Sequence, residues 1–294
     1  MRIDLHTHSR VSDGTDSPTE LMRAAREAGL DVIALTDHDT SAGWAEAVPA
    51  ARRYGVELVR GMEISTEHAG RGVHLLAYLP DPTYPPLVEE LARILEGRDR
   101  RLPAMIERLR RLGVEITEDD VHAVSGDAAA SGRPHVADAL VAKGVVASRD
   151  EAFETYLSAG RPGYVSRYAA PLVDTIETVV AAGGVAVIAH PWGRSSRQWP
   201  GPVELEAFVA AGLSGLEVDH QDHSPRSRDR LRALARDFDL VVTGASDYHG
   251  AGKVGHDLGV NTTDEAEYHR LLERAAASAA VSRRHPPTVV KGQA

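Results

Sequence analysis

Apolar runs of strand length alternate with stretches of helical periodicity along most of the chain. Ser17 and Pro18 mark the start of the first expected helix, and Pro49 is expected to kink the second. Because strand and helix units repeat many times, the pattern indicates an α/β fold with a mainly parallel sheet. The expected strands cover residues 2–8, 31–39, 56–65, 72–80, 185–191, 215–220 and 240–250, and the expected helices beside them cover residues 17–29, 41–55, 172–184, 202–212 and 224–239.

The alternation stops between residues 85 and 170, where only helical patterns occur. At 294 residues the chain is long enough for one large barrel or two ordinary domains. Because strand and helix units lie on both sides of the helical region, an insertion explains it more simply than a second independent domain. We therefore expect a first barrel segment at 1–97, a helical insertion over the active site at 98–170, a second barrel segment at 171–280 and a flexible tail at 281–294.

Composition narrows the class of protein. Hydrophobic residues make up 43% of the chain and charged residues 26%, which is ordinary for a folded globular protein. No apolar run approaches the roughly 20 residues of a membrane helix, and the first residues lack the features of a secretory signal, so we expect a cytoplasmic protein. The chain contains no cysteine, which excludes disulfides, thiolate nucleophiles and sulfur-ligated zinc.

Charge bears on the partners of the protein. The net charge of -10 argues against binding to long duplex nucleic acid, which requires a broad basic surface. A small phosphorylated substrate remains compatible with it, because bound metal ions can reverse the local field. Six arginines occur within residues 98–111; a solvated helix face is favoured there over phosphate or RNA contact.

Residues capable of metal binding recur at the ends of the expected strands. His6 and His8 are two positions apart, so they share one face of a strand, and Asp4 lies on the same face. In a parallel α/β barrel the carboxyl ends of the strands converge, which would bring together the segments DLHTH, LTDHD, GMEIS, GVHLL, IAHP and ASDYH. Imidazole and carboxylate ligands suit zinc, manganese or iron, and their number indicates more than one ion. The other histidines interpreted as surface or structural residues are His68, His122, His256, His269 and His285.

The order of these motifs resembles the PHP family, named for polymerase and histidinol phosphatase. The matching elements are DLHTH, TDHD, GME, HP and SDYH, within residues 2–97 and 171–260. The resemblance implies a distorted (β/α)7 barrel, similar to a TIM barrel, with three divalent metal ions that are Mn²⁺, Fe²⁺ or Zn²⁺. It implies that the first ion is held by His6, His8 and Asp247 and shares Glu63 with a second ion at His74 and His190, and that a third is held by Asp13, His38 and His249.

The resemblance also implies a reaction. A hydroxide bridging the first two ions would attack a phosphoryl group polarised by the third, with Glu63, Asp247 and His38 among the catalytic residues. His223 is a candidate substrate contact or leaving-group acid, and a turn before a helix is the alternative. Asp37 and Asp39 flank His38 and are expected to orient it, unless Asp39 instead caps the next helix.

The turn SDG at residues 12–14 and the helical insertion are similar to one subgroup of the family. That subgroup includes phosphatases of nucleoside 3′,5′-bisphosphates and 5′-exonucleases of short RNA. GRPH at residues 132–135 resembles an element that lies over the substrate, so Arg133 is expected to clamp a phosphate and His135 to contact substrate. The alternative is a capped helix start with a solvated arginine. Tyr164 and Trp192 are candidates for base stacking or for ordinary packing.

The leading hypothesis is a metal-dependent phosphoesterase that acts on a small phosphorylated nucleotide or a short oligoribonucleotide, without long duplex or membrane partners. A histidinol-phosphate phosphatase comes second, because that group more often has a histidine where this chain has Asp13. A non-catalytic PHP module and a metal-dependent amidohydrolase are the further alternatives. The sequence predicts no oligomeric state.

Overall fold

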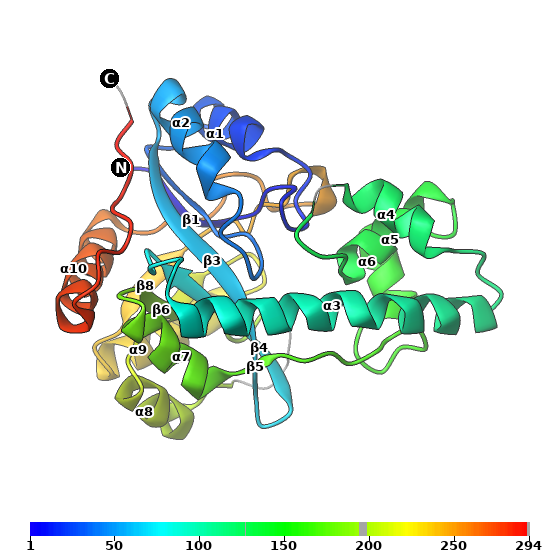
Figure 1. The fold of residues 1–294 in the computed structure, drawn as a ribbon. Coiled ribbons are helices and arrows are strands. Elements are labelled where there is room, and N and C mark those ends of the chain that lie inside the picture. Colours follow the sequence, from blue (N-terminus) through cyan, green and yellow to red (C-terminus); the bar gives the residue numbers. More distant parts are fainter. Residues whose placement is uncertain (127, 194–198, 293–294) are drawn as a thin grey trace.

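A curled sheet lies at the centre of the computed structural model, which describes residues 1–126, 128–193 and 199–292 (Figure 1). Seven strands follow one another in the order β1-β2-β3-β4-β6-β7-β8, and the short β5 pairs with β3. The strands are β1 Ile3–Thr7, β2 Val32–Leu35, β3 Glu57–His68, β4 Arg71–Tyr78, β5 Ala170–Pro171, β6 Val185–Ile188, β7 Leu213–Asp219 and β8 Val241–Gly244.

The two ends of the sheet approach each other. A parallel bridge joins Thr7 to Tyr248, and the backbone N–H of His8 donates to the carbonyl of Tyr248 over 2.9 Å. The sheet is thus curled, which is consistent with the expected distorted barrel. The predicted parallel order is confirmed except at β4, which is antiparallel to both β3 and β6. The reason is local, because the turn at Ala69 and Gly70, both with positive φ, leaves no room for a crossover helix between β3 and β4.

Helices cover both faces of the sheet. Ser17 caps the first of them in a capping box with Glu20, as the sequence predicts. One apolar cluster fills the space between the sheet and most of these helices, and a second lies between the sheet and α10. The sequence patterns did not predict α10. These helices are α1 Pro18–Glu27, α2 Trp44–Tyr54, α7 Leu172–Ala181, α8 Pro202–Ala210, α9 Pro225–Asp237 and α10 Glu265–Ser282.

The region between β4 and β5 is helical, and no strand occurs among its described residues, 79–126 and 128–169. It contains α3 Pro85–Arg111, α4 Glu118–Ser125, α5 Arg133–Ala142 and α6 Arg149–Ala152, which continues into a π-helical turn at Phe153–Leu157. Figure 1 shows α4, α5 and α6 gathered beside one half of α3, away from α7, α8 and α9. A separate apolar cluster holds these helices together.

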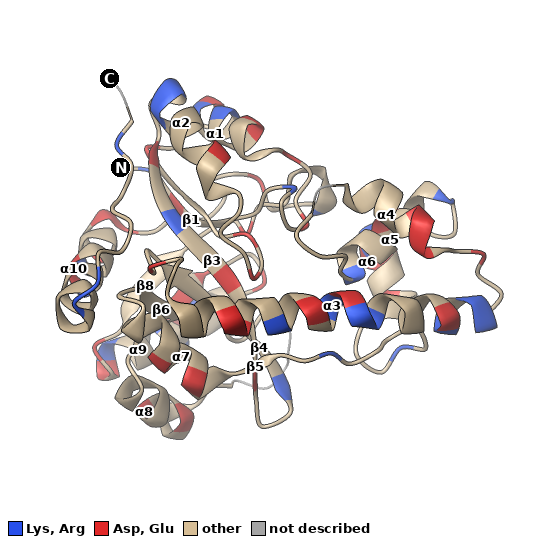
Figure 2. Cartoon of the chain, viewed as in Figure 1, with Lys and Arg blue, Asp and Glu red and all other residues tan. Residues whose placement is uncertain are grey.

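The boundary expected at residue 97 falls inside α3, which is one continuous helix. Leu87 and Ile94 in its first half pack into the core of the barrel. Leu102 and Leu109 in its second half pack into the cluster of the helical region. Figure 2 shows acidic and basic residues along α3 beyond its first turn. Within the described ranges, no helix combines the length and apolar character of a membrane span.

The tail expected to be flexible from residue 281 makes specific contacts as far as the described chain extends. Val290 and Leu58 exchange backbone hydrogen bonds of 2.9 and 3.0 Å, so the tail adds a short bridge to β3. The guanidinium of Arg284 pairs with Asp81 over 2.9 Å. These contacts come from the backbone and from single charges, which leave no periodic pattern in the sequence.

Replacing Val290 with alanine tests this contact. Val290 is 6% exposed, so Val290→Ala is expected to lower the free energy of unfolding by about 1–2 kcal/mol. Val281→Ala is the matched control, because Val281 is 81% exposed and its loss should change stability by less than about 0.5 kcal/mol. Denaturant titration measures both values. Equal stability of the two variants would show that the tail is not packed on β3.

Candidate metal centre

The predicted metal ligands meet at one end of the barrel, although they are spread over most of the chain. Each lies at or just beyond the end of a strand, apart from Glu63 and His74, which lie within the β3–β4 pair. All except His74 are buried, and the side chain of His74 is 19% exposed. The residues brought together are His6, His8, Asp13, His38, Glu63, His74, His190, Asp247 and His249.

Glu63 lies between two groups of histidines. Its Oε2 atom is 3.3 Å from His6 Nε2 and 3.2 Å from His8 Nε2. Its Oε1 atom is 2.7 Å from His74 Nδ1 and 3.2 Å from His190 Nε2. Each carboxylate oxygen therefore has its own set of nitrogen donors, which is the arrangement of a carboxylate that bridges two cations.

His6 and His8 point their ring nitrogens at the same place. Their Nε2 atoms are 3.0 Å apart, and each is 3.6 Å from Asp247 Oδ1. Two imidazole nitrogens and two carboxylate oxygens thus converge inside the protein. This donor set fits a divalent ion bound through nitrogen and oxygen without sulfur.

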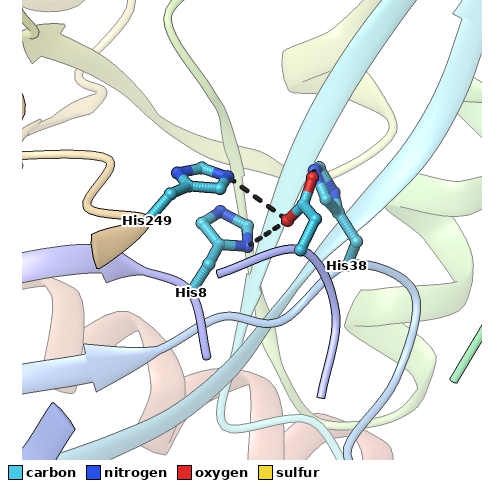
Figure 3. Close-up of side chains that lie close together, drawn as sticks. His8, His38 and His249 are labelled. Atoms are coloured by element: carbon cyan, nitrogen blue, oxygen red, sulfur yellow. Dashed lines mark ion pairs between the residues drawn. The ribbon is translucent and has the colours of Figure 1, made fainter. Parts of the chain in front are cut away.

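A further group forms around Asp13, as Figure 3 shows for His8, His38 and His249. His249 Nε2 is 3.3 Å from Asp13 Oδ1, and His38 Nε2 is 3.6 Å from Asp13 Oδ2. The rings of His8 and His249 stack with centroids 4.1 Å apart. The SDG turn makes this possible, because a Cβ on Gly14 would lie 2.5 Å from the carbonyl oxygen of His8.

The carboxylates of the centre remain ionised. Burial alone would raise the pKa of Glu63, but the surrounding imidazoles, chiefly those of His74 and His38, hold it well below its usual range. Burial acts in the same way on Asp247, whose pKa is held well below its usual range by Lys253 and the histidines. Charged oxygens next to imidazole nitrogens in a buried site favour cation binding.

The backbone is strained at this centre. His190 has φ 29°, Asp247 has φ 53° and Asp39 has φ 58°, values that residues other than glycine adopt uncommonly. Each of them lies two to four residues after the end of a strand: His190 after β6, Asp247 after β8 and Asp39 after β2. Such strain is typical of functional sites, where the surrounding structure holds a side chain in position.

The sequence analysis missed Glu217 and His220 as site residues. Glu217 is fully buried; its Oε1 is 2.9 Å from His6 Nδ1, and its Oε2 accepts a 2.8 Å hydrogen bond from the backbone of His190. Burial opposes ionisation, but neighbouring histidines lower the pKa of Glu217 to about 2. His220 Nε2 is 3.2 Å from Asp247 Oδ2. A glutamate in the middle of the apolar strand GLEV was the available signal.

The side chains of Asp37 and Asp39 form hydrogen bonds and an ion pair with other parts of the chain and do not cap a helix. Asp37 accepts hydrogen bonds from the backbone and hydroxyl of Ser9, at 2.8 and 2.7 Å, and so fixes the loop after β1. Asp39 accepts from the backbone of Ser65 over 2.6 Å and pairs with Arg98 over 2.6 Å. The alternative that Asp39 caps α2 was wrong, because the N-cap residue of α2 is Gly43.

Two predicted substrate contacts have other partners. His223 is 3% exposed; its Nδ1 contacts the carbonyl of Val218 over 2.8 Å, and its Nε2 accepts from the backbone of Trp192 over 3.3 Å. Both ring nitrogens of His223 thus have protein partners, which favours the alternative of a structural residue in the turn before α9. His135 is 5% exposed and accepts the N–H of Gly132 over 3.0 Å, so it caps α5.

The remaining candidates are divided between the cavity and the core. Arg133 lines a cavity of about 1050 Å³ together with Asp13, His38 and His249. Its guanidinium lies 5.6 Å from the ring centroid of Tyr164. Other predicted residues pack elsewhere: Trp192 is 7% exposed and donates to Pro200 over 3.3 Å, and His256 is 6% exposed and contacts the carbonyl of Ser246 over 2.6 Å.

The fold and this centre define a class of protein, an α/β barrel with a buried histidine and carboxylate cluster at the ends of its strands. Residues 4–116 match the PHP domain family. The chain is 36% identical to a 5′-3′ exoribonuclease of Haemophilus influenzae, over 84% of this chain and 90% of the relative. It is 37% identical to a 3′,5′-nucleoside bisphosphate phosphatase of Chromobacterium violaceum, over 87% of this chain and 90% of the relative.

A solved structure supports the same assignment. The protein from Bifidobacterium adolescentis, itself assigned by prediction as a metal-dependent phosphoesterase, matches with a TM-score of 0.88 and 40% identity. The match covers 92% of this chain and 96% of that one. The chain belongs to the PHP family, which confirms the resemblance found in the sequence.

Replacing Glu217 tests whether it positions the metal ligands. Glu217→Gln keeps the shape of the side chain but replaces one carboxylate oxygen with an amide NH₂ group. That group cannot accept a hydrogen bond, so either His6 or the backbone N–H of His190 loses its acceptor. Metal affinity is expected to fall about 10–100-fold. Metal titration followed by calorimetry measures the change, with Glu177→Gln on the exposed face of α7 as control. Unchanged affinity in Glu217→Gln would assign the residue to folding alone.

Proposed function

We propose that the protein is a metal-dependent phosphoesterase that hydrolyses phosphate monoesters of nucleotides. The proposed substrates are a nucleoside 3′,5′-bisphosphate and the 5′ end of a short RNA. The position of Glu63 carries the proposal, because its two oxygens face separate groups of histidines. A carboxylate placed in this way can bridge two ions about 4 Å apart, an arrangement suited to in-line displacement at phosphorus.

The donor set supports three divalent ions, with Mn²⁺, Fe²⁺ or Zn²⁺ as candidates. His6, His8 and Asp247 would hold the first, His74 and His190 the second, and Asp13, His38 and His249 the third, with Glu63 between the first two. When bound, such ions lower the pKa of water and neutralise charge that develops on a transferring phosphoryl group.

The residues of the chain supply position and orientation. Glu217 fixes the ring of His6 through Nδ1, which leaves Nε2 directed toward Glu63 and Asp247. Arg133 and Lys253 line the cavity above the centre, where their charges favour the anionic substrate. We retain Glu63, Asp247 and His38 as catalytic residues in the proposal and Arg133 as a substrate contact.

The cavity supports a nucleotide-sized substrate. Its volume of about 1050 Å³ is slightly above the range for small-molecule sites, about 300–1,000 Å³. Its walls come from both the barrel and the helical region, which contributes Arg133 and Phe153. We therefore propose that residues 98–170 act as an insertion over the active site. The names of the two relatives, a bisphosphate phosphatase and an exoribonuclease, agree with this substrate class.

Phosphate release tests the proposal directly. The panel contains adenosine 3′,5′-bisphosphate, AMP, histidinol phosphate and a short 5′-phosphorylated RNA, with manganese-loaded protein and a metal-stripped control. Rapid release from the bisphosphate or the RNA is expected, and removal of the metals should abolish it because the carboxylate and imidazole groups alone do not activate water. Preference for histidinol phosphate would favour the second hypothesis. The absence of phosphate release from every substrate, in protein that retains its metals, would reject the proposal.

Replacing His38 tests the third ion. His38→Ala removes one imidazole from the group around Asp13 and is expected to lower bound metal by one equivalent and turnover by about 100-fold or more. Elemental analysis and steady-state kinetics measure the two effects. His269→Ala serves as control, since the side chain of His269 is 61% exposed on α10. A variant with normal metal content and turnover would exclude the role assigned to His38.

A further inference from the structure

One arginine of the helical region contacts a loop of the candidate metal centre. Arg149 is the first residue of α6, and its side chain is 13% exposed. Its Nη1 atom donates to the backbone carbonyl of Asp13 over 3.0 Å. Asp13 supplies the carboxylate around which His38 and His249 gather. The contact therefore joins the helical region to the residue at the centre of this group.

A carboxylate of the helical region holds the same guanidinium. Arg149 Nε donates to Asp138 Oδ1 over 2.5 Å, and Arg149 Nη2 donates to Asp138 Oδ2 over 2.6 Å. Such a bidentate pair fixes the plane of the guanidinium as well as its position. Asp138 lies in α5, so two neighbouring helices together direct the third nitrogen of Arg149 toward Asp13.

A second loop of the centre leaves room for this guanidinium. Gly252 ends the short turn Gly250–Gly252, which follows His249 directly. A Cβ atom on Gly252 would lie 2.2 Å from Arg149 Nη1 and 2.6 Å from Arg149 Cζ. Gly252 is not among the glycines with positive φ, so the position requires the absence of a side chain and not an unusual backbone conformation.

The two loops are also bonded to each other. The backbone N–H of Thr15 donates to the carbonyl of His249 over 3.2 Å. The hydroxyl of Thr15 accepts from the backbone N–H of Ala251 over 3.0 Å. The loop after β1 and the loop after β8 thus form one unit, and Arg149 packs against both of its parts.

The candidate ligands of the first ion have a different environment. Within the described ranges, the side-chain hydrogen bonds and ion pairs of His6, His8 and Asp247 all lead to residues of the barrel. A change in the helical region is therefore expected to act chiefly on the group around Asp13.

We infer that Arg149 is a positioning residue that sets the affinity of the group around Asp13 for its metal ion. The inference rests on the proposed function, in which Asp13, His38 and His249 hold the third ion. Arg149 acts through the backbone of Asp13 and through the loop that carries His249. Ligands that are already held in place lose less conformational freedom when an ion binds, so the ion binds more tightly.

Direct contact with the substrate is the alternative role for Arg149, because the residue lines the large cavity. The contacts of its guanidinium favour positioning. Each of its three nitrogens already donates to a protein oxygen, two to Asp138 and one to Asp13. The two roles predict different losses, one in metal affinity and the other in KM.

Stepwise metal binding tests the inference without turnover. The full-length protein is stripped of metal and titrated with Mn²⁺ by calorimetry, and bound metal is counted by elemental analysis at fixed free Mn²⁺. In Arg149→Ala the third equivalent is expected to bind about tenfold or more weakly, and the first two should change less than about threefold. Arg149→Lys should recover part of the loss, because lysine keeps the charge but not the bidentate pair.

Arg111→Ala is the matched control for these titrations. Arg111 also belongs to the helical region and also pairs with a carboxylate, that of Glu107, but its side chain is 71% exposed. All three equivalents should bind to this variant as they bind to the parent protein. A parent protein that binds only two equivalents would overturn the inference, because there would be no third ion to position.

Gly252→Ala displaces the guanidinium while Arg149 stays in the sequence. The three atoms nearest to the added methyl group all belong to Arg149, so this variant is expected to weaken the third equivalent as Arg149→Ala does. In the double variant the methyl group meets no guanidinium, and the loss should not exceed that of Arg149→Ala alone. Additive losses would overturn the inference, because the glycine and the arginine would then act independently.

Kinetics and stability separate positioning from the other roles. Turnover of Arg149→Ala should fall at limiting Mn²⁺ and be largely restored by excess Mn²⁺, with the KM of the parent protein. A raised KM at saturating metal with unchanged metal affinities would overturn the inference in favour of substrate contact. A lower unfolding temperature of the metal-free variant with unchanged metal affinities would overturn it in favour of a role in folding alone.

The same measurements distinguish this inference from the proposed function. Selective loss of the third equivalent in Arg149→Ala, in a protein that releases phosphate from none of the proposed substrates, would support the inference and reject the proposed function. Rapid phosphate release by the parent protein, with equal stepwise affinities in Arg149→Ala and the parent, would reject the inference alone.

Discussion

The carboxylate of Glu63 is the group on which the arrangement of the site depends. It is buried among histidines from β1, β2, β4 and the end of β6, and each of its oxygens faces different ring nitrogens. A buried anion requires compensation, and this one receives it from side chains on four separate parts of the barrel. The curl of the sheet brings those parts together. The reversed strand β4 matters here, because its antiparallel register with β3 places His74 beside Ser65, two residues from Glu63.

A second layer of contacts joins the helical region to the loops of this site. Arg98 of α3 pairs with Asp39, next to His38, and Arg149 of α6 donates to the backbone carbonyl of Asp13 over 3.0 Å. The backbone N–H of Ala129 donates to the carbonyl of Val11 over 2.8 Å. The helices that enclose the cavity are thus bonded to the loops that carry Asp13 and His38. The shape of the cavity and the positions of these candidate metal ligands therefore depend on each other.

The sequence predicted the barrel and the candidate ligands because both follow from short-range patterns. A histidine or carboxylate was visible in or just after most of the expected strands, and a barrel brings strand ends together whatever their order. The contact of His223 with the backbone of Trp192 and the tail contact of Val290 were not predictable, since they involve backbone groups distant in sequence. Glu217 was missed for another reason, because its significance comes from burial. Arg101 was interpreted as part of a solvated helix face, and periodicity alone did not show that it is buried on α3, where it is 6% exposed.

The continuity of α3 has a consequence for how such proteins can diversify. Its first half belongs to the core of the barrel and its second half to the helical region, so the two parts share one rigid element without a joint at residue 97. In a chimaera that carries the helical region of a relative, that region would be rotated or shifted relative to the barrel. The exception is a donor whose α3 packs against the barrel in the same way. New substrate preferences in this architecture are therefore acquired more readily by exchanging single side chains in the cavity wall than by exchanging modules.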